Sequence, residues 1–110
     1  MPNSRRKGKR GELEAAAEIR RLLGLPARRG QQYRGTADSP DVIVDLPGVH
    51  FEVKRTERLR IYQAVEQARR DAHPKIPVVL FRSNRREWLA IVPLEDLVAL
   101  AERLVMFGEG

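Results

Sequence analysis

The sequence SPDVIVDLPGVHFEVK at residues 39–54 decides the fold of this chain. Two short apolar runs flank a Pro-Gly pair, a combination typical of a tight turn, and together they predict a β-hairpin. If the turn contains only the Pro-Gly pair, Asp41 pairs across the hairpin with Lys54. Because side chains alternate along a strand, Asp41, Glu52 and Lys54 are then expected close together on one face.

These two carboxylates and one ammonium predict a divalent-metal site. Asp41 and Glu52 offer the oxygen ligands that Mg²⁺ prefers, and the Val53 carbonyl is a further candidate ligand. The ion would polarise a phosphoryl group and lower the pKa of a water molecule. The Lys54 ammonium would position the attacking water or neutralise charge at phosphorus. The substrate expected for such a site in a basic chain is a phosphodiester.

The alternative interpretation is an ordinary cross-strand ion pair between Asp41 and Lys54, with Glu52 in solvent. The apolar side chain of Ile43 shares the charged face, so this face is expected to be partly covered. Burying two carboxylates there without a cation is costly, and this cost favours the metal site.

A third acidic residue, Glu12, is predicted to approach the same site. Residues 11–23 repeat apolar side chains at helical spacing, and the resulting buried stripe consists of Ala15, Ala16, Ile19, Leu22 and Leu23. Glu12 lies on the same side of this helix and should point inward. Its alternative role is to interact with the positive end of the helix and the free amides there. With Asp41 and Glu52 nearby, approach to the metal is the better explanation.

His50 and Asp45 pair across the hairpin in the expected register. A His–Asp pair can act in acid–base catalysis, but both residues lie at the turn end of the hairpin, so we interpret them as a surface pair. Gln63, on the second predicted helix, is a further candidate for orienting water or phosphate. The sequence contains no Gly-rich phosphate loop, serine nucleophile elbow or zinc-ligand spacing. The acidic cluster is therefore the main candidate for catalysis.

Composition indicates an intracellular protein with an anionic partner. The chain has 110 residues, enough for one domain, and 21 Lys and Arg against 15 Asp and Glu give a net charge of +6. It has no Cys, no apolar run of membrane-spanning length and no apolar stretch after the basic N-terminus that would make a secretory signal. Such a basic chain is typical of nucleic-acid binding, and an inert basic surface is the alternative.

Basic residues are concentrated before the first predicted helix and in arginine pairs. Those expected to contact DNA phosphates are Arg5, Arg6, Lys7, Lys9, Arg10, Arg28 and Arg29, with Arg85 and Arg86 as a further cluster. Aromatic residues are few and mostly at expected core positions, so stacking on single strands is not predicted. This composition favours duplex or branched DNA recognised by its shape.

The pattern predicts a single domain over residues 1–110. After a basic segment at 1–10 that is expected to be mobile, and the first helix, the predicted elements are a loop at 27–40 with a short strand near 32–34, the hairpin, a helix at 58–72 and strands at 78–81 and 88–92. A last helix begins at Pro93, and its buried stripe is Leu94, Leu97, Val98, Ala101, Leu104 and Val105. This order indicates an α/β fold with a single mixed β-sheet flanked by helices.

The assembled residues resemble the PD-(D/E)xK nuclease superfamily, whose core is restriction-endonuclease-like. The residues that carry the resemblance are Pro40, Asp41, Glu52, Val53 and Lys54, with Glu12 upstream. The short chain, the opening RRKGKRGELE at residues 5–14 and the helix after the second strand look like archaeal-type Holliday junction resolvases, a group also carried by phages. The similarity covers residues 4–92 in order and spacing.

The resemblance implies a homodimer that binds four-way DNA junctions by shape and cuts two opposing strands with Mg²⁺ or Mn²⁺, leaving 5′-phosphates. It implies Glu12, Asp41 and Glu52 as the acidic site residues and Lys54 as the catalytic lysine. The basic opening segment would meet the junction, and Ser39 would occupy the serine position of the loop before the aspartate. The last predicted helix departs from the family pattern, so the dimer interface is left open.

Two other functions remain open at this point. The first is another nicking or end-directed DNA nuclease on the same scaffold, because such enzymes share the metal chemistry. The absence of a second, specificity domain argues against a restriction enzyme. The second is a non-catalytic nucleic-acid-binding protein in which the acidic cluster is structural.

Overall fold

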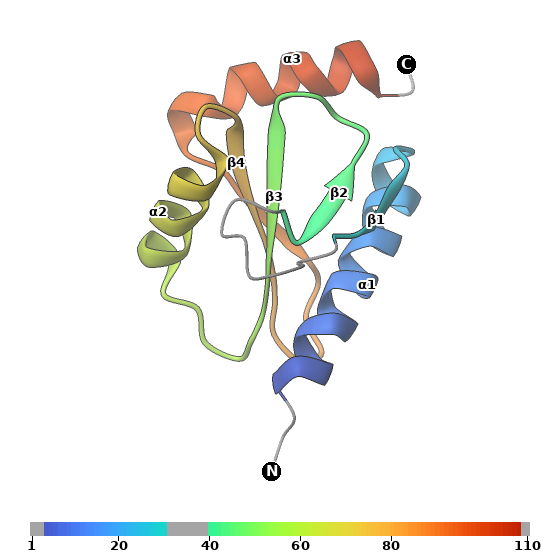
Figure 1. The fold of residues 1–110 in the computed structure, drawn as a ribbon, viewed down its shortest axis with the longest axis vertical. Helices are drawn as coiled ribbons and strands as arrows, with labels where there is room; N and C mark the ends of the chain where they lie inside the picture. Colours follow the sequence, from blue (N-terminus) through green and yellow to red (C-terminus); the bar gives the residue numbers. More distant parts are fainter. Residues whose placement is uncertain (1–3, 31–39, 109–110) are drawn as a thin grey trace.

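The computed structural model describes residues 4–30 and 40–108, with side chains from Gly8 onward (Figure 1). In chain order the elements are α1 (Ser4–Leu23), β1 (Ala27–Arg29), β2 (Val42–Val44), β3 (Val49–Arg55), α2 (Ile61–Ala72), β4 (Ile76–Arg82), β5 (Leu89–Ile91), a short 3₁₀ helix η2 (Leu94–Asp96) and α3 (Leu97–Phe107). The described strands form one sheet in the order β1-β2-β3-β4-β5, in which β3 and β4 are parallel and the other neighbours are antiparallel. The predicted α/β fold with a single mixed sheet and flanking helices is confirmed.

Helix α1 is longer than the sequence pattern indicated, because it begins at Ser4 and not at Gly11. Residues 4–10, expected as a separate basic segment, therefore belong to the helix, in agreement with the high helix propensity of Lys and Arg. Gly24 ends α1 in the left-handed conformation (φ 68°), and its N–H donates to the Arg20 carbonyl at 3.1 Å.

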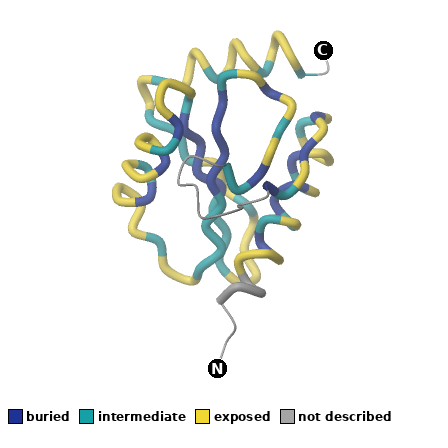
Figure 2. The backbone as a smooth tube through the Cα atoms, in the orientation of Figure 1, coloured by how far each residue is buried: buried dark blue, intermediate teal, exposed yellow. Residues whose placement is uncertain are grey.

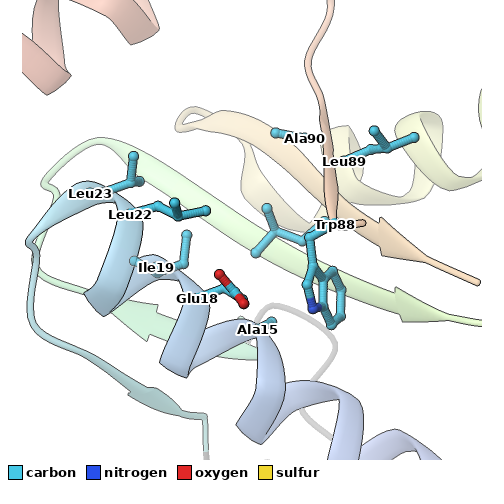
Figure 3. A pocket seen from close by; sticks show the side chains of 9 residues that line it. Ala15, Glu18, Ile19, Leu22, Leu23, Trp88, Leu89 and Ala90 are labelled. Atoms are coloured by element: carbon cyan, nitrogen blue, oxygen red, sulfur yellow. The ribbon is translucent and has the colours of Figure 1, made fainter. Parts of the chain in front are cut away.

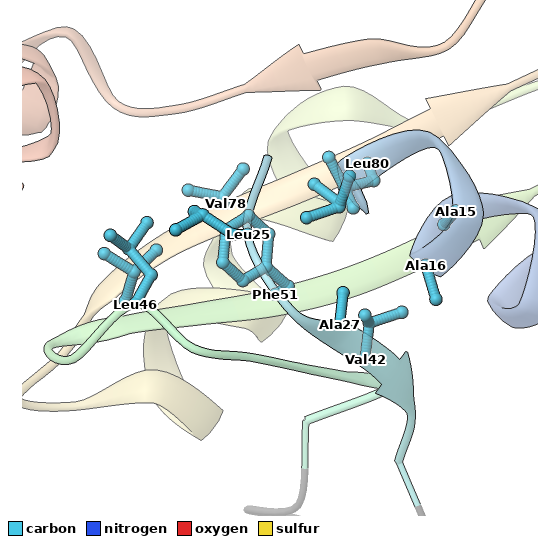
Figure 4. Packing of buried hydrophobic residues seen from close by; sticks show 11 residues of the cluster. Ala15, Ala16, Leu25, Ala27, Val42, Leu46, Phe51, Val78 and Leu80 are labelled. Atoms are coloured by element: carbon cyan, nitrogen blue, oxygen red, sulfur yellow. The ribbon is translucent and has the colours of Figure 1, made fainter. Parts of the chain in front are cut away.

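Helices cover both faces of the central strands β3 and β4, which contain long buried stretches (Figure 2). The cluster between α1 and the sheet, shown in part in Figure 4, includes Ala15, Ala16, Ile19, Phe51, Val78 and Leu80. On the opposite face, Ala64 and Ala68 of α2 pack against Val79 of β4. Because β3 is central and covered on both faces, its first four residues are all buried. This sandwiched strand is the element that carries most of the candidate site.

The hairpin register differs from the predicted register by two residues. Val42 is the partner of Phe51, whereas a two-residue turn would have placed Val44 there. The connection is longer because Leu46 turns into the core, where only 2% of it is exposed. Burial of the Leu46 side chain stabilises the fold more than the extra strand pairs of a tighter turn would have done.

Strand β1 was missed by the sequence pattern, because three residues with two arginines show no apolar alternation. It pairs antiparallel with β2, with Ala27 level with Val44. The Arg20 guanidinium of α1 donates to the Ala27 carbonyl at 2.6 Å and ties the strand to the helix. The short strand predicted near 32–34 lies outside the described residues.

Helix α3 crosses one end of the sheet (Figure 1). Leu100 and Leu104 pack against the core, while Leu94, Val98 and Val105 are exposed. The predicted buried stripe is therefore wrong except at Leu104, because apolar residues cover most of this helix and give little signal for its rotation. Within residues 4–30 and 40–108, no helix combines the length and the apolar character that crossing a membrane requires.

An apolar pocket of about 130 Å³ lies between α1 and the β4–β5 edge of the sheet (Figure 3). Its lining residues are Ala15, Glu18, Ile19, Leu22, Leu23, Leu80, Trp88, Leu89 and Ala90. The pocket belongs to the α1-covered face of the sheet. Glu52 and Lys54 of β3 point to the other face, so this pocket is not part of the candidate site.

Candidate active site

The α2-facing side of β3 carries His50, Glu52 and Lys54 in succession, because side chains alternate along the strand. The parallel register with β4 sets this side of the strand against α2. Lys54 lies near the end of β3, and its Nζ donates to Gln67 Oε1 on α2 at 3.2 Å. Gln67 is therefore the α2 amide that contacts the lysine, and the role of Gln63 in orienting water or phosphate stays a prediction.

Asp41 lies just before β2, where hydrogen bonds hold both its backbone and its side chain. Its N–H donates to the Phe51 carbonyl at 3.1 Å, and its Oδ2 accepts from the Val53 N–H at 2.8 Å. Because antiparallel partners keep a constant sum of residue numbers, the observed register places Asp41 level with Glu52. The predicted pairing of Asp41 with Lys54 is wrong for this reason.

Asp41 and Glu52 interact directly through their charges. The pKa of Glu52 is raised to about 7. Burial is the largest cause; the hydrogen bond with His50 opposes the shift, and a hydrogen bond with Asp41 and the Asp41 charge add to it. Burial, with the Asp41 charge added to it, thus favours the protonated form of Glu52, and a cation beside the two carboxylates would favour the ionised form.

Glu12 lies near Asp41 and is largely buried, as predicted for an inward-pointing side chain. Arg29 Nε donates to Glu12 Oε1 at 2.6 Å. Burial raises the pKa of Glu12, the Arg29 hydrogen bond opposes the shift, and the Asp41 charge raises the pKa further. Since α1 begins at Ser4, Glu12 is too far from the helix end to act as a partner for the free amides there. Arg29, expected on the DNA-binding surface, instead pairs with Glu12.

Asp41 and Glu52 are the residues that fit a divalent cation. Mg²⁺ usually takes one or two carboxylates and completes its shell with water and phosphate oxygens. In the described part of the chain, no three His, Cys, Asp or Glu side chains are grouped so as to hold a metal ion. Glu12 is thus not part of a preformed three-carboxylate cluster, because Arg29 engages it. The role of the Val53 carbonyl as a ligand stays a prediction.

His50 is the site residue that the sequence interpretation misplaced. Its Nε2 lies 2.8 Å from Glu52 Oε1, and both residues are buried, so the predicted surface pair with Asp45 is wrong. In the observed register Ile43 is level with His50, and the Asp45 N–H donates to the Pro26 carbonyl at 2.9 Å. Strand alternation, which puts His50 two positions from Glu52 on one face, was the available signal.

Several predicted DNA contacts are exposed, namely Lys9, Arg10 and Arg28. Four other predicted DNA contacts stay predictions. The side chains of Arg5, Arg6 and Lys7 are not described, and Ser39 lies outside the described residues. Gly11 of α1 packs closely on Arg55 of β3, since a Cβ on Gly11 would lie 2.6 Å from the Arg55 Cβ. This contact brings the basic half of α1 to the Lys54 end of β3 (Figure 1).

Comparisons with protein-family models, with curated proteins and with solved structures found no match for this chain.

Proposed function

We propose that this chain is a metal-dependent DNA endonuclease of the PD-(D/E)xK type. The observation that carries the proposal is the position of the Asp41 carboxylate beside Glu52, held by the 2.8 Å hydrogen bond from the Val53 N–H, with Lys54 on the same face of β3 as Glu52. Two adjoining acids and an amine, on or directly beside rigid strands, are suited to hydrolysis of a phosphodiester.

Each site residue has a distinct role in the proposed reaction. Asp41 and Glu52 would hold Mg²⁺, or Mn²⁺ in its place, and the bound ion would supply Lewis-acid stabilisation of the phosphate charge. The Lys54 ammonium, held by Gln67, would bind the attacking water or the charge that develops at phosphorus. Glu12, paired with Arg29, would add negative charge at the edge of the site without a direct bond to the substrate.

Four-way junction DNA is the proposed substrate. The net charge of +6 and the exposed Lys9, Arg10 and Arg28 support binding to backbone phosphates, which carries no sequence information. Aromatic residues make up only 5% of the chain, which argues against base stacking as the means of recognition. The preference for junctions over linear duplex comes from the resemblance to archaeal-type resolvases.

A homodimer is proposed on the same resemblance. Its contact surface is proposed from exposed apolar residues of η2 and α3. Leu94, Val98 and Val105 are 83%, 71% and 81% exposed. Together with the exposed Ala101 they follow the spacing 4-3-4, which is that of the apolar seam of paired helices. Two-fold pairing with a second copy would bury this stripe on both chains, because the same surface is used twice.

Cleavage assays test the proposal directly. Purified protein is incubated with a four-way junction, a flap, a linear duplex and a single strand, in Mg²⁺ or in EDTA, and we expect Mg²⁺-dependent cutting of the junction. Lys54→Ala and Asp41→Asn should abolish cutting and leave junction binding intact. Equal cutting of linear duplex at matched salt would contradict junction selectivity and indicate another nuclease on this scaffold.

A non-catalytic nucleic-acid-binding protein is the second candidate. It is favoured by two internal pairs, Glu12 with Arg29 and Glu52 with His50, which give these carboxylates partners without a metal. If the wild-type protein binds the junction but cuts no substrate in Mg²⁺ or Mn²⁺, this second function replaces the first.

A further inference from the structure

His50 is a buried residue that the proposed reaction does not use. Only 3% of its side chain and 7% of that of Glu52 are exposed, and the two side chains are joined by the 2.8 Å contact between Nε2 and Oε1. A well-packed apolar residue would fill such a position with no need for a partner, and buried polar pairs rarely stabilise a fold more than apolar packing does. The pair is better explained by what it does to Glu52.

We propose that His50 is a positioning residue for Glu52, which it holds by donating the Nε2–H to Oε1. The inference rests on the proposed function, because it requires Glu52 to be a metal ligand. An ionised carboxylate can only accept hydrogen bonds, so Nε2 carries the hydrogen in the metal-binding form.

The expected consequence concerns metal affinity and not DNA binding. A glutamate side chain has several rotatable bonds, and a partner that restricts them in advance reduces the entropy lost when an ion binds. Loss of a hydrogen-bond partner of a metal ligand typically weakens metal binding by about 10- to 100-fold. His50 lies inside the protein, so its replacement should leave the affinity for junction DNA in EDTA unchanged.

Three substitutions of His50 separate the effect of its hydrogen bond on metal affinity from the effect of its side-chain volume. His50→Gln keeps an N–H donor at about the reach of Nε2, His50→Asn is too short to reach Glu52, and His50→Met fills the space without a donor. His73→Gln, at the other and exposed histidine of the chain, controls for loss of an imidazole elsewhere.

Mn²⁺ binding to the DNA-free protein is measured by isothermal titration calorimetry, with circular dichroism to check folding. We expect wild type, His73→Gln and His50→Gln to bind with similar affinity, and His50→Asn and His50→Met to bind about 10- to 100-fold more weakly. Junction cleavage by the weak variants should recover as Mn²⁺ is raised, because the ligand set is intact. If His50→Met fails to fold, the comparison of His50→Asn with His50→Gln decides.

The outcomes separate the inference from the function on which it rests. If His50→Asn binds Mn²⁺ with the affinity of the wild type, the positioning role of His50 is overturned and the nuclease proposal stays in place. If His50→Gln binds Mn²⁺ as weakly as His50→Asn and His50→Met, the hydrogen bond is not the cause of the weaker binding. Wild-type protein that binds no Mn²⁺ would remove the metal site itself, and both proposals with it.

Discussion

The Oδ2 atom of Asp41, the residue just before β2, accepts a hydrogen bond at 2.8 Å from the N–H of Val53 in β3. A side chain thus pairs with the β3 backbone just before the first residue of β2. Because Val53 lies between Glu52 and Lys54, this single bond brings the Asp41 carboxylate to the part of β3 that carries both other site residues. The candidate site is built around this contact.

Asp41→Asn should separate the structural role of this residue from its chemical role. The Asn side-chain oxygen can still accept from the Val53 N–H, but the charge that would hold a cation is lost. We expect cleavage to be abolished with little change in the free energy of unfolding. Asp41→Ala, which also loses the hydrogen bond, should unfold more easily by about 1–3 kcal/mol. Single-turnover cleavage and urea unfolding test both statements, and equal stability of the two variants would contradict the role of the bond.

The raised pKa of Glu52 predicts a specific pH dependence of stability. Between the ordinary pKa of 4.5 and the folded value of about 7, the folded state keeps a proton that the unfolded chain releases. The free energy of unfolding should therefore decrease as pH rises through this window, by about 3 kcal/mol at most. Urea unfolding at pH 5, 6, 7 and 8 measures the slope, which Glu52→Gln should flatten.

Divalent metal should reverse this loss of stability. A cation binds the ionised carboxylates of the folded state, so added Mg²⁺ should stabilise the protein at pH 8 more than at pH 5. Stabilisation of Glu52→Gln by Mg²⁺ to the same extent as wild type would show that the ion binds elsewhere.

Arg28 and Arg29 are neighbours in sequence with different predicted roles. Arg29→Met leaves the largely buried Glu12 carboxylate without its 2.6 Å partner and should destabilise the fold by about 1–3 kcal/mol. Arg28→Met removes an exposed charge, so its stability should stay within about 0.5 kcal/mol of wild type while junction binding at low salt weakens. Urea unfolding and salt-dependent gel shifts distinguish them. Glu12→Gln in the Arg29→Met background should restore part of the lost stability.

Gly11 and Gly8 provide a matched pair within α1. A Cβ on Gly11 would lie 2.6 Å from the Arg55 Cβ, so Gly11→Ala must push α1 away from β3 and should cost about 1–3 kcal/mol. Gly8 has nothing within 4 Å of the same position, so Gly8→Ala should stabilise the helix by about 0.5–1 kcal/mol. Thermal unfolding of both variants checks the opposite signs, and a neutral Gly11→Ala would mean that the helix does not approach the strand so closely.

The exposed stripe on α3 predicts a variant that separates dimerisation from folding. Val98→Glu places a charge in the proposed contact between two copies and should shift the protein toward monomer. Ala99→Glu, exposed on the same helix but outside the 4-3-4 stripe, should leave the dimer intact. Sedimentation equilibrium over a range of concentrations measures the association. A wild-type protein that stays monomeric throughout would contradict the homodimer.

Much of the candidate site follows from local periodicity. The two-residue repeat of a strand places Glu52 and Lys54 on one face, and the helical repeat places Glu12 on the apolar side of α1; the structure has both features. The same repeat could have placed His50 with Glu52. These relationships need no knowledge of the rest of the chain, because they are properties of single elements.

Contacts between distant segments decided what the sequence pattern did not. The hairpin register depends on burial of Leu46. The hydrogen bond that engages the Glu12 carboxylate comes from Arg29, which lies on a strand too short to show a pattern. Strand alternation alone was enough to predict which side chains share a face of β3. That Asp41 stands level with Glu52 could be known only from the folded protein, because register is chosen by the total apolar surface that packing removes from water and not by the residues of the turn alone.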